Sequence, residues 1–476
     1  METSDARRNR VTGEPRPAPA MTRRRLVGRF AAAGGAIALT AAATACGAGA
    51  QESAPSVDAK PVELETWHTH TVPSVSFEGF QAVLDDYKKL RPNTSFKLTF
   101  IAGSSASMAG GYNDKITSAI AAGTPPDVLH MNRPPEFGEA GLLTELGQYI
   151  KKDKTFNAGD FFEGPWARCT FFDRVWGIPV ICDNRAIWIN KAAYVEAGLD
   201  PSKPPKTWNE MEQAAQKLTK TGPGGLERVG FLPVDVGNAD LYSWIYANGG
   251  DIVTVTPDKA DIGFNKPAAV EAADWLVRMF DRVGGYDNWA AFKKNFQGQA
   301  QDPFFQKQLA MKRDGSFFLS TVRQYSPQTE YILAPEPYGP SGKGPATLVG
   351  GYNWSISRGA KNAEAGWNFL SWFSQKDPAT KYAAPQGVMP GRKSAANTDY
   401  VTKNPDIKFF FEALKYSKPF PTAPWTQFMW DNVNVEAQNA IIRRQKTPKV
   451  ALDDAAQKVQ LEIDKWLREN RDRNKK

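Results

Sequence analysis

The sequence lacks the patterns that mark several large protein classes. Its one extended apolar run, residues 30–45, covers 16 residues, whereas a membrane-spanning helix needs about 20 strongly apolar residues. No nucleophile elbow, H-E-x-x-H pair or Rossmann glycine pattern is present. The stretch GPSGKG at 339–344 resembles a phosphate loop, but its glycine spacing is wrong and no Ser or Thr follows Lys343. These absences exclude enzymes that carry such motifs. A glycan hydrolase, which needs only two suitably separated carboxylates, stays open.

Excess positive charge is also scarce once the first residues are set aside. The chain has 59 basic and 51 acidic residues, a formal charge of +8. Residues 1–45 contain eight Arg and three acidic residues, so +5 of that charge belongs to them and +3 to the other 431 residues (476 − 45). A nucleic-acid-binding face needs clustered basic residues, which this balance argues against.

Cysteine is rare as well, with Cys46, Cys169 and Cys182 the only three. Between the last two, TFFDRVWGIPVI predicts a hairpin that turns at Asp173-Arg174. That register would place Cys169 opposite Ile178, so both a Cys169–Cys182 disulfide and two free thiols remain open.

Histidine occurs only at positions 68, 70 and 130, and each is expected near the end of a strand. His68 and His70 would share one face of their strand. Together with His130 they could bind zinc, which defines a metal-binding alternative. Histidine is also a good hydrogen-bond donor to hydroxyl groups, so the pattern does not require a metal.

The basic and apolar residues near the start form an export signal. Thr22–Val27 fits the twin-arginine type and precedes the apolar run, which ends in small residues. Ala43-Thr44-Ala45-Cys46-Gly47 resembles the lipobox of bacterial lipoproteins, with Ala43 in place of the usual Leu. That resemblance implies lipidation of Cys46, with ordinary cleavage as the alternative. We expect a signal peptide over 1–45 and a flexible tether over 46–61, and translation could start at Met1 or Met21.

The remaining chain alternates strand and helix patterns. Residues 62–70, 95–102 and 127–131 read as strands, separated by helices over 76–90 and 113–123. This β-α-β-α-β order is typical of a parallel sheet with crossover helices. The pattern then restarts with a helix over 207–220, a strand over 229–235 and helices over 239–250 and 266–285. Helices also dominate the last third, over 363–375 and 450–470. The sequence thus predicts an α/β protein with two units.

Several segments in order are similar to the family 1 extracellular solute-binding proteins, the sugar-binding receptors of bacterial ABC importers. They are IAAGTPPDVLHMN, AGLLTELGQYI, VWGIPVICDNRAIWINKAAYVEAGL, PPKTWNEMEQAAQKLT, NGGDI, QLAMKRDGSFF, VGGYNWSISRGAKNAEAGWNFLSWFS and GVMPGR. Together they cover roughly residues 62–470.

The resemblance implies a type II periplasmic-binding-protein-like fold, in which two α/β lobes close on a ligand by hinge motion. The hinge crossings are expected near Ile181–Asp183, Thr347–Val349 and Ala395–Val401. The N-terminal lobe would comprise residues 62–181 and 350–396. The C-terminal lobe would comprise 184–346 and 402–470.

A sugar site needs flat aromatic side chains against the ring face and fixed polar groups around its rim. Ligands of open α/β sheets bind at the carboxyl ends of strands. This strand-end rule selects Trp67, His68, His130 and Asn132. Asp183 is selected because it lies at the first expected hinge crossing. The resemblance adds Tyr242, Trp244, Asp314, Phe317, Gly351, Tyr352, Arg392, Trp425 and Trp430.

Each of these residues also has a purely structural explanation. Trp244 and Trp430 could be core residues, Asp183 could cap the next segment, and Arg392 could bridge the lobes. Trp354, Trp367 and Trp372 are interpreted as packing residues.

The resemblance therefore predicts a monomeric, non-catalytic receptor without a cofactor. It would capture a carbohydrate, expected to be an oligosaccharide, and deliver it to an ABC permease. It would be held by lipid on the outer face of the cytoplasmic membrane and would not bind nucleic acid. The alternatives are the metal-binding receptor using His68, His70 and His130, and an extracellular glycan hydrolase.

Overall fold

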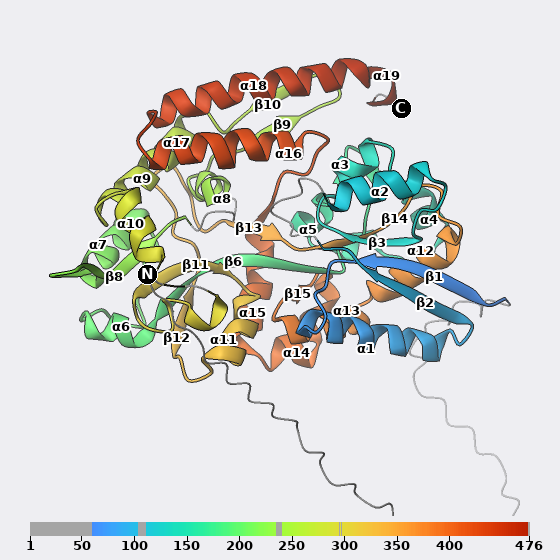
Figure 1. The fold of residues 1–476 in the computed structure, drawn as a ribbon, viewed down its shortest axis with the longest axis horizontal. Coiled ribbons are helices and arrows are strands. Elements are labelled where there is room, and N and C mark those ends of the chain that lie inside the picture. The colour runs from blue at the N-terminus through green and yellow to red at the C-terminus, as the bar shows by residue number, and fades with distance from the viewer. Residues whose placement is uncertain (1–59, 103–110, 235–239, 295, 297, 475–476) are drawn as a thin grey trace, which may run out of the picture. The chain divides into compact units, whose positions relative to one another are not determined.

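A computed structural model describes residues 60–102, 111–234, 240–294, 296 and 298–474 (Figure 1). The described residues all belong to one compact unit, Val57–Lys476. The expected export signal, Cys46 and most of the tether lie outside the described residues. In the described part, no helix is both long and apolar enough to cross a membrane.

A four-stranded sheet contains the first three strands of the chain. Its order is β14-β3-β1-β2, with β1 (Val62–His68) parallel to both β2 (Thr94–Phe100) and β3 (Val128–Met131). The predicted β-α-β-α-β unit is therefore confirmed. β14 (Asn353–Ile356) joins the edge of β3 in the antiparallel direction. This return of a distant segment follows from no local pattern.

Helix α1 (Val75–Leu90) shows how the sequence builds this part of the fold. The Ser74 hydroxyl caps the helix by accepting a hydrogen bond from the Phe77 amide. Phe80, Val83, Leu84 and Tyr87 then recur on the face that is buried in the core. The other helices of this region are α2 (Tyr112–Ala121), α3 (Pro134–Glu139), α4 (Gly147–Lys152), α5 (Glu163–Ala167), α12 (Ala363–Phe373) and α13 (Lys376–Ala383).

An eight-stranded sheet is built around the long strand β6 (Ile181–Asn190). The other strands of this sheet are β7 (Lys220–Gly222), β8 (Gly225–Leu232), β11 (Leu309–Gly315), β12 (Tyr331–Ala334), β13 (Thr347–Gly350), β15 (Met389–Pro390) and β16 (Ser417–Pro419). Strands β11, β12, β13 and β15 all pair with β6 in the antiparallel direction. Because four strands surround it, β6 is buried along almost its whole length. Figure 1 shows β6 across the centre, with the four-stranded sheet beyond one of its ends.

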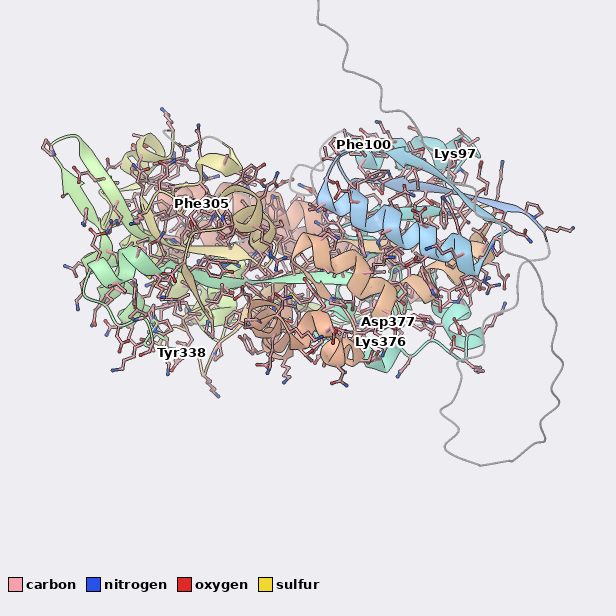
Figure 2. The ribbon with its side chains drawn as sticks, turned by 90° about the horizontal axis from the view of Figure 1, so that it is seen from below. Lys97, Phe100, Phe305, Tyr338, Lys376 and Asp377 are labelled. Carbon is pink, nitrogen blue, oxygen red and sulfur yellow. The ribbon has the colours of Figure 1, made fainter. Side chains whose placement is uncertain are left out.

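Helices cover the eight-stranded sheet, and a long C-terminal helix packs beside them (Figure 1). They are α6 (Lys191–Glu196), α7 (Trp208–Leu218), α8 (Asp240–Ala247), α9 (Pro267–Asp281), α10 (Tyr286–Lys293), α11 (Phe318–Tyr325), α14 (Asp399–Thr402), α15 (Pro405–Ala413), α16 (Thr426–Met429), α17 (Gln438–Ile442), α18 (Pro448–Glu469) and α19 (Arg471–Asn474). A π-helix, Trp430–Ala437, continues α16 into α17. Short strands β9 (Val253–Val255) and β10 (Ala260–Ile262) form a separate pair. Figure 2 shows the side chains on both parts, with Lys97 and Phe100 near the four-stranded sheet and Phe305 near the larger one.

Three distant segments meet at the beginning of β6. Gly350 pairs with Asp183, and Met389 pairs with Cys182. Cys182, Val349 and Met389 are buried in one hydrophobic cluster. The pairing of β6 with β13 joins the first two expected hinge segments. The pairing of β6 with β15 involves residues 389–390, which precede the third expected hinge at 395–401. The lobe boundaries given above stay a prediction.

The expected hairpin before β6 forms, but with another register. β4 (Thr170–Phe171) pairs with β5 (Arg174–Val175), and the Trp176 amide donates to the Cys169 carbonyl. Cys169 therefore faces Trp176 rather than Ile178. Cys169 and Cys182 are both buried free thiols, so the disulfide considered between these two residues is not present. The Cys169 thiol instead donates to Asn353 Oδ1, 3.2 Å away.

Candidate functional site

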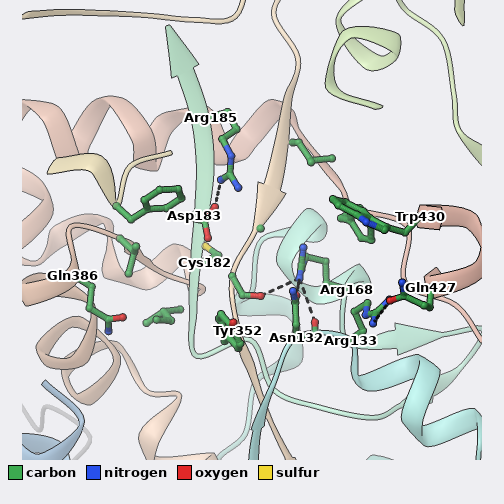
Figure 3. A pocket seen from close by; sticks show the side chains of 17 residues that line it. Asn132, Arg133, Arg168, Cys182, Asp183, Arg185, Tyr352, Gln386, Gln427 and Trp430 are labelled. Carbon is green, nitrogen blue, oxygen red and sulfur yellow. Dashed lines mark hydrogen bonds and ion pairs between the residues drawn. The ribbon is translucent and has the colours of Figure 1, made fainter. Parts of the chain in front are cut away.

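A cleft of about 350 Å³ opens where β3 ends and β6 begins. Figure 3 shows the 17 residues that line it. They come from separate parts of the chain: Asn132, Arg133, Arg168, Ile181, Cys182, Asp183, Arg185, Phe317, Leu348, Gly350, Gly351, Tyr352, Gln386, Val388, Phe420, Gln427 and Trp430. The lining combines aromatic rings with guanidinium, amide and carboxylate groups, which is the usual composition of a small-molecule site.

Aromatic side chains reach the cleft from three places. Phe317 precedes α11 and is 37% exposed. Tyr352 follows β13 and stacks on His130, with ring centroids 4.6 Å apart. Trp430 begins the π-helix and packs against Phe420 at 5.8 Å. Each ring is held by packing on one side and borders the cleft, so a flat apolar ligand face could stack on it.

Arg168 fastens the loops on one side of the cleft. Its guanidinium donates to the carbonyl oxygens of Val349 (3.0 Å) and Gly351 (2.9 Å) and to the amide oxygen of Asn132. These acceptors follow β3 and end β13, so one side chain fixes both loops relative to each other. The side chain is 3% exposed, and burial lowers the pKa of its guanidinium.

Asp183 and Arg185 alternate along β6 and therefore point to the same face. Arg185 donates to the Asp183 carboxylate, and its guanidinium carbon lies 5.2 Å from the centre of the Phe317 ring. Gly350 lies opposite, and a Cβ there would approach Asp183 Oδ1 to 2.7 Å. Glycine at 350 thus leaves space for the carboxylate at the cleft surface.

Arg133 connects the end of β3 to α16. Its guanidinium donates to Gln427 Oε1 at 2.9 Å, and its Nε lies 3.2 Å from Glu136 Oε2. Burial raises the pKa of the Glu136 carboxyl to about 7, and the Arg133 charge partly offsets that rise. The arginine thereby contacts both sides of the cleft.

The structure brings six of the fourteen predicted ligand residues into this cleft. They are Asn132, Asp183, Phe317, Gly351, Tyr352 and Trp430. The other eight do not line it: Trp67, His68, His130, Tyr242, Trp244, Asp314, Arg392 and Trp425.

Tyr242 and Trp244 belong to α8, a helix that is buried on every side. The Tyr242 hydroxyl donates to the Met429 carbonyl at 3.3 Å, and Trp244 Nε1 donates to the Pro233 carbonyl at 2.8 Å. Arg313 fixes the same helix through an ion pair with Asp240 and a second one with Glu336. These aromatics therefore stabilise the core.

Trp425 and Arg392 also have structural partners. The Trp425 ring packs edge-on against Phe171 and Trp466 at 5.6 and 5.5 Å. Arg392 donates to the carbonyls of Ser374 and Asn157, and its guanidinium carbon lies 4.3 Å from the centre of the Phe161 ring.

The last two predicted ligand residues other than the histidines, Trp67 and Asp314, interact with residues close to them in sequence. Trp67 is half-buried on β1, and its Nε1 donates to Glu65 at 3.2 Å. The Asp314 carboxylate pairs with Lys312 at 2.8 Å and accepts from the Gly315 amide.

The three histidines lie together beneath the cleft rather than in it. The ring centroids of His70 and His130 are 4.3 Å apart, and those of His68 and His70 are 5.6 Å apart. The Tyr382 hydroxyl lies between Nε2 of His70 (2.8 Å) and Nε2 of His130 (3.4 Å). Burial lowers the pKa of His70 to about 3 and that of His130 well below the ordinary value.

This packing corrects the metal-binding alternative. Among the residues that the structure describes, no group of three His, Cys, Asp or Glu side chains is arranged to hold a metal ion. The three rings stack and hydrogen-bond instead of converging on one point. His130 contributes to the cleft indirectly, as the platform under Tyr352.

Sequence reasoning missed the charged lining, chiefly Arg133, Arg168 and Arg185. Arg133 follows the predicted residue Asn132, and Arg185 lies two positions after the predicted residue Asp183, so a wider window around each would have found them. No local pattern selects Arg168. It enters the cleft only because α5 folds beside β13.

Comparison with known proteins agrees with this architecture. The profile of the family described as bacterial extracellular solute-binding protein matches residues 73–380. A binding protein of Brucella abortus is 26% identical over 350 residues, which cover 72% of this chain and 81% of that protein. The sn-glycerol-3-phosphate-binding periplasmic protein UgpB of Shigella dysenteriae is 24% identical over 385 residues, 73% of this chain and 83% of that protein.

A solved structure has the same fold. CpMnBP1 with mannobiose bound superposes with a TM-score of 0.70 and 25% identity, over 83% of this chain and 99% of that one. The two-lobed periplasmic-binding-protein-like fold is therefore confirmed. With a matching family profile over most of its length, this chain belongs to the family 1 bacterial extracellular solute-binding proteins.

Proposed function

We propose that this chain is the receptor of an ABC importer, which captures a carbohydrate in the cleft and delivers it to the permease. The carrying observation is the cleft lining, in which Phe317, Tyr352 and Trp430 border hydrogen-bonding groups of several types. CpMnBP1, which is 25% identical, binds mannobiose and mannotriose. An oligosaccharide is accordingly the expected kind of ligand.

The proposal extends to the placement of the protein. A twin-arginine signal would export the folded chain, and acyl chains on Cys46 would hold it at the outer face of the cytoplasmic membrane as a monomer. The proposed receptor role involves no catalysis, and among the described residues that line the cleft Asp183 alone is acidic. Mass spectrometry of the mature N-terminus tests the anchor, and an unmodified Cys46 would refute it.

Thermal denaturation with a panel of sugars tests the binding role, because a ligand bound only by the folded state raises Tm. We expect at least one sugar to raise Tm and to change tryptophan fluorescence. Binding of a different solute class with no response to any sugar would refute the proposal.

A pair of variants locates the response in the cleft. Phe317→Ala should weaken sugar binding about tenfold, the equivalent of about 1.4 kcal/mol of lost ring stacking. Tyr325→Ala is the matched control, since Tyr325 has a similar exposure of 41% on α11 but does not line the cleft. Equal loss in both variants would contradict a cleft-bound sugar.

A further inference from the structure

The cleft contains a buried positive charge, Arg168, that has no hydrogen-bonded carboxylate among the described residues. Arg168 is 3% exposed, and all its hydrogen-bond acceptors are neutral oxygens, those of Val349, Gly351 and Asn132. Its Nε–H is buried and has no hydrogen-bond partner among the described residues. A buried charge that lacks a hydrogen-bonded counter-ion is unfavourable, so this site favours a negative group in the cleft.

One lining carboxylate acts on two arginines. Burial lowers the pKa of the Arg168 guanidinium, the Asp183 carboxylate opposes that change, and the like charge of Arg185 lowers the pKa further. The Asp183 carboxylate also accepts a hydrogen bond from Arg185, whereas the Arg133 guanidinium is paired with Glu136. Three guanidinium groups thus line the cleft with a single lining carboxylate (Figure 3).

The two cysteines near Arg168 cannot supply the missing charge. Burial raises the pKa of the thiols of both Cys169 and Cys182, so both remain uncharged at neutral pH. Arg133 has Glu136 and Asp431 as acidic neighbours, whereas Arg168 and Arg185 share the Asp183 carboxylate, so this part of the lining has one positive charge in excess. Hydrogen-bond donors also predominate in this lining, which suits an acceptor-only group such as a carboxylate or phosphate.

We propose that the ligand is an acidic carbohydrate, a sugar bearing one carboxylate or phosphate that binds beside Arg168 and Arg185. This inference rests on the proposed receptor function and narrows its substrate class. The anion supplies a second negative charge for Arg168 and Arg185, which share the Asp183 carboxylate. The sugar ring would then lie toward Phe317, Tyr352 and Trp430.

Matched ligand pairs test the charge directly. Glucose, mannose and galactose are each compared with their 6-phosphates and uronic acids by calorimetry, with inorganic phosphate as a separate probe. At least one acidic member should bind about tenfold or more tightly than its neutral partner, and the preference should shrink from roughly 20 mM to roughly 500 mM salt. The uronate and phosphate series separate the two kinds of anion.

Two cleft variants should change the preference in opposite directions. Asp183→Asn removes the only lining carboxylate and should strengthen acidic-ligand binding, whereas Arg185→Gln frees Asp183 and should weaken it. A structural role alone would weaken binding in both. Arg278→Gln, which removes a half-exposed arginine outside the cleft, is the control and should change nothing. The salt series on the native protein remains decisive if a variant fails to fold.

The outcomes separate this inference from the receptor function. Equal binding of neutral and acidic sugars, or a shift in the same direction for both cleft variants, would overturn the inference and leave a carbohydrate receptor. Failure of every sugar, neutral or acidic, would overturn both. Binding of inorganic phosphate without any sugar would overturn the carbohydrate assignment.

Discussion

The buried histidine cluster predicts that the protein loses stability as the pH falls from 7 to 5. His70 is 6% exposed and lies against His68 and His130. Burial lowers the pKa of its imidazole from 6.5 to about 3, and repulsion from His68 adds to this effect. In the unfolded chain the same group takes up a proton as the pH falls through 6.5.

The sign and size of the stability change follow from the difference in proton binding by His70 between the folded and unfolded states. Between pH 6.5 and about 3 the unfolded state holds a proton on His70 and the folded state does not, so acid favours unfolding throughout this window. The loss between pH 7 and pH 5 is about 2 kcal/mol for His70 alone, from 1.4 kcal/mol per unit of pH below 6.5. His130 should act in the same direction, because burial also lowers its pKa.

Denaturant unfolding followed by circular dichroism at pH 7 and pH 5 measures this difference. The His70→Gln variant should lose about 2 kcal/mol less than the native protein between the two pH values, although it is less stable at both. Tyr382→Phe is the control, since it removes the hydroxyl between the rings but keeps every histidine. The same pH dependence in His70→Gln and the native protein would refute the reasoning, because it would mean that folded His70 also becomes protonated.

Three further predictions concern the cleft floor, the core and the thiols. Gly351 has φ +116°, and a Cβ there would lie 2.9 Å from Cys182 Cα. Gly351→Ala should therefore destabilise the protein by about 1–3 kcal/mol in denaturant unfolding. Gly224→Ala is the control and should be nearly neutral, because the space around Gly224 is open. Arg313→Leu removes the ion pairs of two buried carboxylates, Asp240 and Glu336, and should cost about 3–5 kcal/mol by the same assay. A loss below about 1 kcal/mol would contradict the buried network. Cys169 and Cys182 should be alkylated only after unfolding, without a reductant, as peptide mass spectrometry would show; a disulfide would leave both unlabelled.

The local parts of the fold were predictable from the sequence because they depend on local periodicity. The alternation in residues 62–70 and the spaced apolar residues of 76–90 became β1 and α1, and their parallel pairing followed from the order of elements. The central role of β6 was not predictable. Its partners β11, β12, β13 and β15 lie about 120 to more than 200 residues further along the chain, and their pairing depends on long-range packing that no local pattern records.

Trp244 and Trp430 show how far the aromatic candidates could have been sorted beforehand. The stretch DLYSWIYA is apolar on nearly all sides, and a helix of that kind is expected to be buried. The stretch WDNVNVEA carries polar residues around Trp430, which places that ring at a border between core and solvent. Helix composition therefore separates the core tryptophan from the cleft tryptophan, although both lie on helices.

The arginines could not be sorted in this way, and the reason is physical. A guanidinium group has five donors and can either fasten backbone carbonyls or bind a ligand, so the residue type carries no preference between the two roles. Arg392 is outside the cleft lining, where it donates to Ser374 and Asn157 and lies 3.4 Å from an Asp160 carboxylate oxygen. Arg168 fastens two loops and also lines the cleft, and its buried Nε–H has no hydrogen-bond partner among the described residues. The hydrogen-bond acceptors distinguish the two arginines, because those of Arg168 are neutral and the one lining carboxylate that acts on it, Asp183, is shared with Arg185, so a ligand can supply the further negative charge.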